Sequence, residues 1–389
     1  MKFKTSNHIY AHIDCDSFFA SCEILRNPKL YGKYVCVGTE IIIAATYNAK
    51  ALGVKVGTPI WEAKKILRGK DAYFLWHNMD FYREVSQKLM SYLRAHVLDV
   101  REFSIDEAFV DISWLSELKG MDLDDYVLHL QHDILQTIGI PVSIGVSNTR
   151  LKAKIFSKVR KPFGIYIWID AEREADMFQK LSFREIPFIG SKTAKKLDFY
   201  ITSIQDYLHL GYFEITRKFW KNGWKIWLEL RGVSSMWFTP KLQAKSIGRA
   251  RSFNTDMTSD PRILLDKIAS NLDRIFVTLS QKQYEIWNIS LLLVHKNWEN
   301  KTIDYDFKQY THDRRLVFQR LEQMFDEIYI PGELYRKTWV FSSAIRSFNI
   351  KQLSLFYREN MDFSKNVHLE KLMQDFKQKY WKDLVRIGE

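Results

Sequence analysis

The sequence has few of the features that mark secreted and membrane proteins. It contains three cysteines, Cys15, Cys22 and Cys36, with no CxxC pair and no nearby His-x-x-x-His, so we expect neither a disulfide framework nor a zinc site. The N-terminal segment has no apolar signal core, and no run of about 18 apolar residues occurs anywhere in the chain. We therefore expect a protein of the reducing cytoplasm that is neither exported nor inserted in a membrane.

The chain also has no low-complexity tract and no internal repeat at a fixed period. Hydrophobic residues make up 46% and aromatic residues 15% of its 389 residues, which is enough material for packed cores throughout. At roughly 150 residues per domain, this length predicts two to four domains. The formal net charge of +12 favours a polyanionic partner such as nucleic acid. Because many soluble proteins are equally basic, the motifs must decide.

The first half of the chain alternates short apolar strands with helices. We expect strands over residues 9–13, 41–46, 101–113 (or a hairpin arm there) and 142–146, and helices over residues 17–26, 60–67, 80–96 and 124–138. This alternation is typical of an α/β or α+β layered domain. Asp14 therefore lies at the end of the first strand.

The second half begins with a different pattern. Residues 183–230 predict short helices rich in Lys, Arg and aromatic residues, around a turn at 186–191, and 241–246 is a polar connector. A second α/β unit follows, with strands expected over residues 247–253, 286–294 and 338–345 and helices over residues 263–279 and 314–327. Beyond residue 349 a tail keeps helical spacing near its end.

Two acidic clusters interrupt apolar strands: Asp14 with Asp16, and Asp106 with Glu107. A buried carboxylate costs several kcal/mol unless it is paired or holds a metal. Each cluster alone is compatible with a solvated strand end or a structural ion pair. Together, three carboxylates suit a pair of Mg²⁺ ions that would clamp the two oxygens of a phosphoryl transfer. Because neighbouring side chains of a strand point to opposite faces, Asp106 and Glu107 can share a site only at a turn or strand end.

Four segments, in this order, carry a family resemblance: HIDCDSFFASCE, ATYNAKALGVKVGTPIWEAKKI, FSIDEAFVDIS and PVSIGVSNTRLKAKIFSKVRKPFGI. They resemble the successive motifs of the Y-family DNA polymerases, the DinB/UmuC-type translesion enzymes, over most of residues 8–350. The resemblance implies an α+β, multidomain, right-hand polymerase. It has a ferredoxin-like palm (1–22 and 80–170), small fingers (23–79), a helical thumb (171–240), a linker (241–246), an α/β little finger (247–350) and a clamp-binding tail (351–389).

The resemblance also implies the ligands of two Mg²⁺ ions, for which Mn²⁺ can substitute. Asp14 and Asp106 would bridge both ions, Glu107 would hold the ion at the primer end, and the backbone carbonyl of Cys15 would complete the nucleotide-side ion. Asp16 follows the family pattern without being a ligand there, and a helix N-cap is an equally good interpretation of it.

The same alignment of motifs implies the dNTP contacts. Phe19 matches the aromatic steric gate against a ribose 2′-OH, although a core aromatic is the plainer interpretation. Phe18 lies in the first turn of the helix whose free backbone N–H groups would bind the triphosphate. Tyr47, Lys50 and Lys161 match its side-chain contacts. Lys50 replaces the Arg usual in DinB-like members, so a point charge stands where the family has a bidentate fork.

The expected DNA contacts are weaker patterns. Residues 186–197 resemble a helix-hairpin-helix turn, with Phe188 where the family often has Gly. The alternative to DNA contact is a solvated basic face in the helical part and an ordinary edge strand in the second α/β unit. The residues expected to touch primer-template DNA are Gly190, Lys192, Lys245, Arg249 and Arg251.

Gln352, Leu353, Leu355 and Phe356 resemble the pentapeptide with which bacterial polymerases bind the sliding clamp, and the chain is expected to be a monomer. The resemblance thus predicts low-fidelity translesion synthesis from dNTPs on a primer 3′-OH. Two other functions stay open from the residues: a palm-fold nucleotide cyclase, and a non-catalytic scaffold that binds clamps or DNA.

Overall fold

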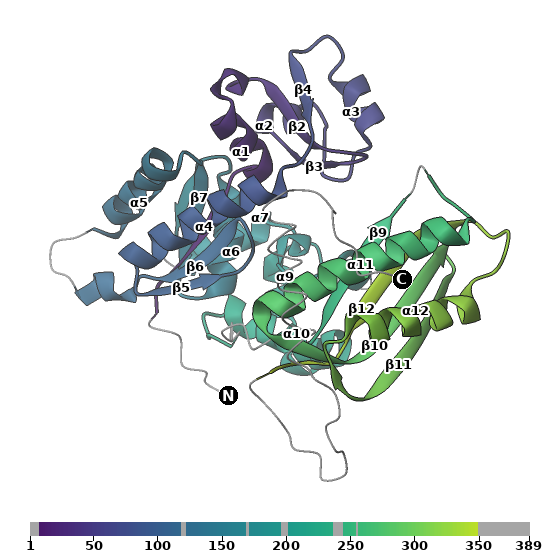
Figure 1. Cartoon of the computed structure of the whole chain (residues 1–389). Coiled ribbons are helices and arrows are strands. Elements are labelled where there is room, and N and C mark those ends of the chain that lie inside the picture. Colours follow the sequence, from purple (N-terminus) through teal and green to yellow (C-terminus); the bar gives the residue numbers. More distant parts are fainter. Residues whose placement is uncertain are drawn as a thin grey trace. The chain divides into compact units, whose positions relative to one another are not determined.

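The computed structural model (Figure 1) describes residues 8–117, 122–168, 171–195, 201–235, 244–253 and 256–348. The chain divides into two compact units, residues 1–240 and 241–389. No helix among the described residues is long and apolar enough to cross a membrane.

The first unit is built on a five-stranded sheet in the order β5-β6-β1-β7-β8. Its strands are β1 (Tyr10–Cys15), β5 (Asp99–Glu102), β6 (Glu107–Asp111), β7 (Val142–Ser147) and β8 (Ile165–Ile167). β1 lies in the middle and is antiparallel to both β6 and β7. Of the two interpretations of residues 101–113, one continuous strand is wrong: the segment belongs to a hairpin of two strands, β5 and β6, joined by a turn that contains Asp106.

The two faces of this sheet have different cores. Ala11 and Ile13 pack with α4 (Met79–His96) and α5 (Leu123–Ile138), whereas His12, on the opposite face, meets α6 (Arg150–Val159). α6 lies so close to β7 that a Cβ on Gly145 would be 2.1 Å from the backbone nitrogen of Ser157. Only glycine allows this approach, which brings α6 side chains to the end of β1.

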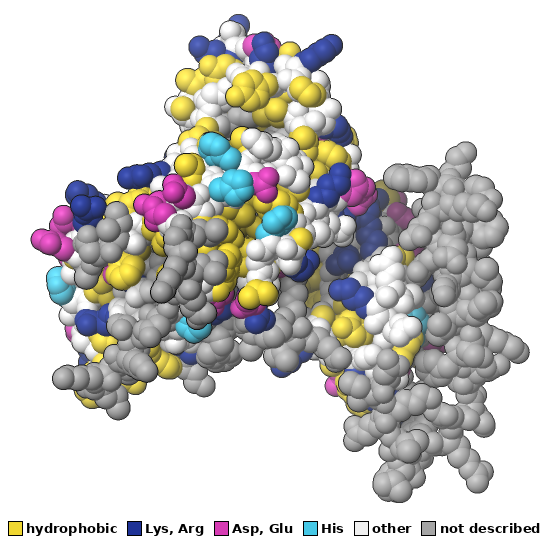
Figure 2. All heavy atoms as spheres, turned by 90° about the vertical axis from the view of Figure 1, so that its left-hand side faces the viewer, with side chains coloured by type: hydrophobic (Ala, Val, Ile, Leu, Met, Phe, Trp, Pro, Cys, Tyr) yellow, Lys and Arg dark blue, Asp and Glu magenta, His cyan; other side chains and the backbone are white. Residues whose placement is uncertain are grey.

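A smaller three-stranded sheet, β3-β2-β4, follows β1 in the chain. Its elements and the helices around it are α1 (Phe18–Arg26), η1 (Pro28–Leu30), β2 (Tyr34–Gly38), β3 (Ile42–Ala45), α2 (Tyr47–Ala51), α3 (Ile60–Ile66) and β4 (Ala72–Leu75). This subdomain has its own small core. Several large apolar side chains stay exposed on it, among them Tyr31, Trp61 and Trp76. Figure 2 shows apolar patches beside basic side chains on this part, at the top of the view.

The rest of the first unit is helical. After η2 (Ser113–Glu117) in the sheet region, its elements are α7 (Ala171–Lys180), η3 (Phe183–Glu185), α8 (Ser191–Lys195), α9 (Ile204–His209) and α10 (Tyr212–Leu230). Their shared core includes Leu151 and Phe156 of α6. Glu229 of α10 is fully buried and accepts hydrogen bonds from Thr149 and Leu151 at the start of α6. The helical part is therefore anchored to the helix that flanks β1.

The second unit is a sheet in the order β11-β10-β12-β9, with β13 paired to β10. Its elements are β9 (Ile247–Ser252), α11 (Pro261–Lys282), β10 (Tyr284–His295), β11 (Asn300–Thr311), α12 (Arg314–Ile328), β12 (Tyr335–Ser342) and β13 (Ile345–Ser347). α11 and α12 pack on one face and bury a core of Leu, Ile and Phe side chains (Figure 1). β9 is an edge strand of this sheet.

Candidate active site

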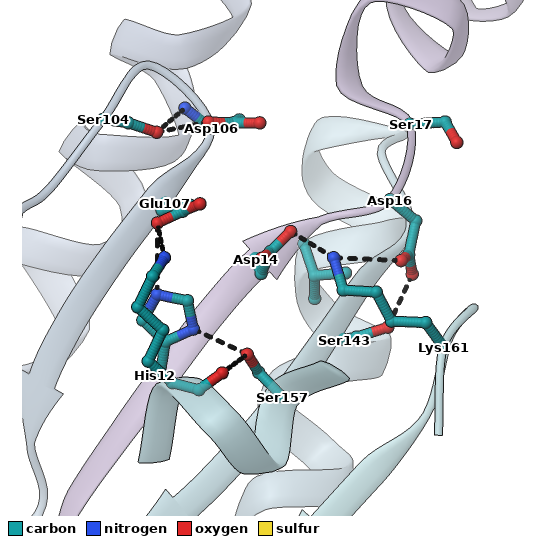
Figure 3. A network of polar contacts seen from close by, with 12 residues as sticks. His12, Asp14, Asp16, Ser17, Ser104, Asp106, Glu107, Ser143, Ser157 and Lys161 are labelled. Atoms are coloured by element: carbon teal, nitrogen blue, oxygen red, sulfur yellow. Dashed lines mark hydrogen bonds and ion pairs between the residues drawn. The ribbon is translucent and has the colours of Figure 1, made fainter. Parts of the chain in front are cut away.

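The predicted metal-binding carboxylates come from the neighbouring ends of two paired strands and from the turn before one of them (Figure 3). Asp14, near the end of β1, stands opposite Glu107, the first residue of β6. Asp106 is in the turn before β6, and its carbonyl accepts a hydrogen bond of 2.9 Å from the N–H of Cys15. Asp106 thus lies outside the strand, so the alternation of strand side chains does not fix its side chain on the face opposite Glu107.

Glu107 is held by residues that sequence reasoning missed. Lys154 of α6 donates to its carboxylate, and His12 Nε2 lies 3.4 Å from the same oxygen. Burial works to raise the pKa of Glu107, but His12 and Lys154 outweigh it and hold that pKa at about 2. Burial lowers the pKa of His12, so this histidine is neutral at pH 7. At 3.4 Å its contact is weak, and Lys154 is the main partner of Glu107.

Asp14 is buried and makes an ion pair with Lys161, one of the predicted triphosphate contacts. Burial raises the pKa of Asp14, although the Lys161 ammonium group lowers it in part. Lys161 Nζ is also 3.7 Å from Asp16 Oδ1, so this lysine lies between two carboxylates (Figure 3).

Asp16 is a buried hydrogen-bond acceptor for several segments, and it is not the helix N-cap that the sequence allowed. Ser17 occupies the N-cap position of α1, while Asp16 is 2% exposed. Its carboxylate accepts hydrogen bonds from Ser143 Oγ at 2.8 Å, Phe163 N at 2.7 Å and Tyr47 Oη at 3.1 Å. A buried carboxylate with three donors is satisfied, so Asp16 connects β1, β7, the 161–164 turn and α2.

The remaining predicted phosphate contacts surround the start of α1. Lys50 Nζ donates to Ser17 Oγ at 2.8 Å and lies 4.3 Å from the Tyr47 ring centroid. Burial lowers the pKa of Lys50, and the nearby Lys161 lowers it further. Burial, with Asp16 beside it, raises the pKa of Tyr47, so its hydroxyl stays protonated as a donor. Two lysines share a small region close to a helix N-terminus.

The two phenylalanines of α1 differ in exposure. Phe18 is buried, whereas Phe19 is partly exposed and stacks on Tyr82 of α4 with ring centroids 4.7 Å apart. Tyr82 is in turn fixed by a 2.6 Å hydrogen bond to Glu23. The Phe19 ring is thus held from one side and keeps another side accessible.

The predicted DNA contacts fall in both units. In the first, Phe188 has a φ of 73°, and a Cβ added to Gly190 would meet no described atom within 4 Å. Lys192 is exposed on α8. In the second unit, Lys245, Arg249 and Arg251 are exposed, and Arg249 donates to Thr278 of α11 at 3.2 Å. The expected clamp-binding residues, Gln352, Leu353, Leu355 and Phe356, lie outside the described residues.

The donor set at the strand ends fits a divalent cation. Among the described residues no three His, Cys, Asp or Glu side chains approach one another closely enough to hold an ion as they stand. Lys161 and Lys154 instead neutralise Asp14 and Glu107. These carboxylate oxygens are the hard donors that Mg²⁺ prefers, and the positive charge that they need is now supplied by lysines. The residues are therefore compatible with a metal that would replace or share these lysine contacts.

Comparison with known sequences shows the family of this chain. Residues 13–158 match the model of the IMS family, described as the impB/mucB/samB family. The DNA polymerase IV of Staphylococcus epidermidis is 32% identical over 298 residues, which is 72% of this chain and 82% of that protein. The DNA polymerase IV of Staphylococcus aureus strain RF122 has the same identity over the same length, which covers 89% of that protein.

Solved structures show the same fold. A Y-family DNA polymerase chimera, Dbh-Dpo4(243-245)-Dbh, aligns with a TM-score of 0.71 at 24% identity over 86% of this chain and 98% of its own. An insertion ternary complex of Dbh DNA polymerase aligns with a TM-score of 0.57 at 23% identity, over 87% of this chain and 99% of its own. The α+β, multidomain architecture expected from the sequence is thereby confirmed.

Proposed function

Because this chain belongs to the Y-family DNA polymerases, as a bacterial DinB-type member, we propose that Asp14, Asp106 and Glu107 are its catalytic residues. It is a template-directed DNA polymerase of low fidelity that performs translesion synthesis. The observation that carries the site assignment is the register of β1 against β6, which sets Asp14 opposite Glu107 beside the Asp106 turn.

The family uses a divalent metal, and we propose two Mg²⁺ ions, with Mn²⁺ as a substitute. Asp14, Asp106, Glu107 and the Cys15 carbonyl would hold them. The ions would supply positive charge to the attacking and leaving oxygens of nucleotidyl transfer.

Lys50, Lys161 and Tyr47 are proposed to bind the dNTP triphosphate. The two lysines repel each other, since the charge of Lys161 lowers the pKa of Lys50. A polyanion between them would relieve that repulsion, and it would also give Lys161 a partner other than Asp14. The first N–H groups of α1, at Phe18 and Phe19, would add backbone donors.

Primer extension tests the catalytic assignment. Asp106→Ala and Glu107→Ala should each abolish extension with Mg²⁺ on plain and damaged templates, while binding of primer-template DNA persists. Asp111→Asn, at the far end of the same strand, is the matched control and should stay active. Full activity in either alanine variant would contradict the assignment. Nucleotide cyclisation without DNA would support the cyclase, and DNA binding without extension by the unmodified chain would support the scaffold.

We propose that the chain contacts DNA through backbone groups and basic side chains. Gly190 leaves open space beside its backbone, as a turn that approaches a phosphate chain requires, and Lys192 follows it. In the second unit, Lys245, Arg249 and Arg251 lie on or beside the edge strand β9. Arg249 donates a hydrogen bond to Thr278 of α11. Because β9 is at the edge of its sheet, a DNA strand would contact these side chains along the free edge of β9.

A sliding clamp is the proposed protein partner, and the chain is proposed to act as a monomer in the bacterial cytoplasm. Replacing Gln352, Leu355 and Phe356 together with Ala should spare the extension of short primers and remove stimulation by the clamp, because the tether that raises effective concentration is lost. Equal stimulation of the variant would dismiss this tether. Sedimentation of the free chain tests the monomer.

A further inference from the structure

A β-turn in the helical part carries an aromatic residue where backbone geometry calls for glycine. Ile189 N–H donates to the Ile186 carbonyl over 3.2 Å, so Pro187 and Phe188 are the central residues of the turn. Phe188 has a φ of 73°. Proline followed by a residue with positive φ is the pattern of a type II turn, whose second central position favours glycine. A phenylalanine there is strained, and such strain is retained where surroundings or function require it.

Core packing does not account for this phenylalanine, because the residue is 54% exposed. Its ring instead meets Phe103 edge-on, with centroids 6.2 Å apart and planes at 73°. Phe103 lies in the turn between β5 and β6. This contact joins the helical part to the turn that carries Asp106.

On its other sides, Phe103 contacts a second aromatic ring and a charged ammonium group. It meets the buried Phe109 edge-on at 5.6 Å, and the Lys154 ammonium group lies 4.5 Å from its ring centroid. Both geometries are attractive, the second because a cation is drawn to the face of an aromatic ring. Lys154 is the residue that pairs with Glu107.

Phe103 therefore contacts Glu107 itself and also Lys154, the main partner of its carboxylate. Its backbone N–H donates to the Glu107 carbonyl at 3.0 Å, and its ring lies under the lysine that binds the Glu107 carboxylate. Ser104, the next residue, donates from its hydroxyl to Asp106. A shift of Phe103 would move the orientation of Glu107 through two independent contacts.

The helical part that carries Phe188 is fastened to the helix that carries Lys154. Buried Glu229 of α10 accepts from Thr149, the N-cap of α6, through its carbonyl and from Leu151 N of α6 at 3.4 Å through its carboxylate. Phe188 is thus presented to Phe103 from a body that is tied to α6, rather than from a free loop.

Resting on the polymerase function proposed above, we infer that Phe188 is a positioning residue of the catalytic turn. It braces Phe103, and through Phe103 it sets Lys154 and Glu107. Because the same turn leads to Gly190, where the primer-template backbone is proposed to bind, engagement of DNA by the helical part is coupled to the geometry of the carboxylates.

Phe188→Gly tests this inference sharply, because glycine accepts the positive φ and the change removes the whole side chain, including its ring contact with Phe103. We expect the single-turnover rate of correct dNTP incorporation to fall about fivefold and the Mg²⁺ concentration for half-maximal rate to rise about threefold, the size of coupling carried by a contact network. The melting temperature should be unchanged or higher, which excludes a general loss of folding. The affinity for primer-template DNA should change less than about twofold.

Two further variants complete the test. Phe213→Ala removes another exposed phenylalanine of the helical part and should leave the rate and the Mg²⁺ dependence unchanged. Phe103→Leu should slow incorporation to a similar extent, and the double variant should be no slower than Phe103→Leu. Additive losses in the double variant, or weaker DNA binding with an intact rate in Phe188→Gly, would overturn the coupling. An unmodified chain that fails to extend primers would refute the polymerase function instead.

Discussion

The carboxylate of Asp16 joins segments that are far apart in the chain. Its donors Tyr47, Ser143 and Phe163 lie 31, 127 and 147 residues away. A hydrogen bond to a charged group contributes about 1.5–3 kcal/mol, so this carboxylate sets where the two lysine-bearing segments stand. Its effect on the site is indirect, through the placement of Tyr47 and Lys161.

Asp16→Asn should raise the KM for dNTP about tenfold with a smaller change in kcat, because the neutral amide weakens the hydrogen bonds that place the proposed triphosphate contacts. Steady-state single-nucleotide incorporation measures both constants. Ser143→Ala removes one of the three donors and should show a smaller rise. An unchanged KM in Asp16→Asn would remove this role.

Phe19→Ala should lower the preference for dNTP over rNTP at least about tenfold, since the ring that would meet a ribose 2′-OH is gone. The stack on Tyr82 holds that ring in one orientation. Competitive incorporation of the two nucleotides measures the preference, and Phe19→Tyr is the control that keeps the ring. Equal selectivity in the alanine variant would reject Phe19 as the steric gate.

Among the elements, α9 has a local sequence pattern whose contribution to the free energy of unfolding can be measured. Ser203 and Asp206 form a capping box, in which the Asp206 carboxylate accepts from the backbone of Ser203 and Thr202. These backbone hydrogen bonds hold the pKa of Asp206 at about 2, below its ordinary value of 3.8. Because the pKa of Asp206 is lower in the folded than in the unfolded chain, its ionised carboxylate stabilises the fold at a pH above the unfolded pKa. This stabilisation is lost as the pH falls toward about 2.

Asp206→Asn should therefore lower the free energy of unfolding by about 1 kcal/mol at neutral pH, the usual contribution of a cap. The difference from the unmodified chain should shrink as the pH falls from about 4 to about 2, where the carboxylate protonates. Urea unfolding over a pH series measures it. Asp176→Asn, on the exposed side of α7, should give no such trend. A constant difference at every pH would contradict the cap assignment.

β1 shows what alternation within one strand decides. Ala11 and Ile13 face the core under α4 and α5, while His12 and Asp14 share the other face. A polar residue two positions before a carboxylate, inside an otherwise apolar strand, was the pattern that could have identified His12 as part of the site. Lys154 had no comparable pattern, because a lysine in a helix is usually solvated.

At the scale of the whole molecule, the net charge of +12 should appear as salt-dependent DNA binding. Arg251→Ala should lower the slope of log affinity against log salt concentration by about 1, the value for one phosphate contact. The loss of affinity should be similar for all DNA sequences. Titration of primer-template DNA at several salt concentrations measures the slope. Lys301→Ala, on the opposite edge strand β11, is the matched control. Equal slopes for the unmodified chain and Arg251→Ala would remove the β9 edge as a DNA contact.

The order of the motifs, the candidate carboxylates and most long helices could be predicted from the amino-acid sequence, because hydrophobic periodicity reports which face of each element is buried. The sequence did not predict β11 as a strand, because its residues are mostly exposed and polar and only Ile303, Tyr305 and Phe307 alternate toward the core, or β8, which has three residues. Three contacts came from the folded structure alone: Asp16 accepts hydrogen bonds from three segments, Lys154 binds Glu107, and Phe188 packs on Phe103. These pairs are 31 to 147 residues apart, and no local pattern specifies which distant side chains packing will bring together.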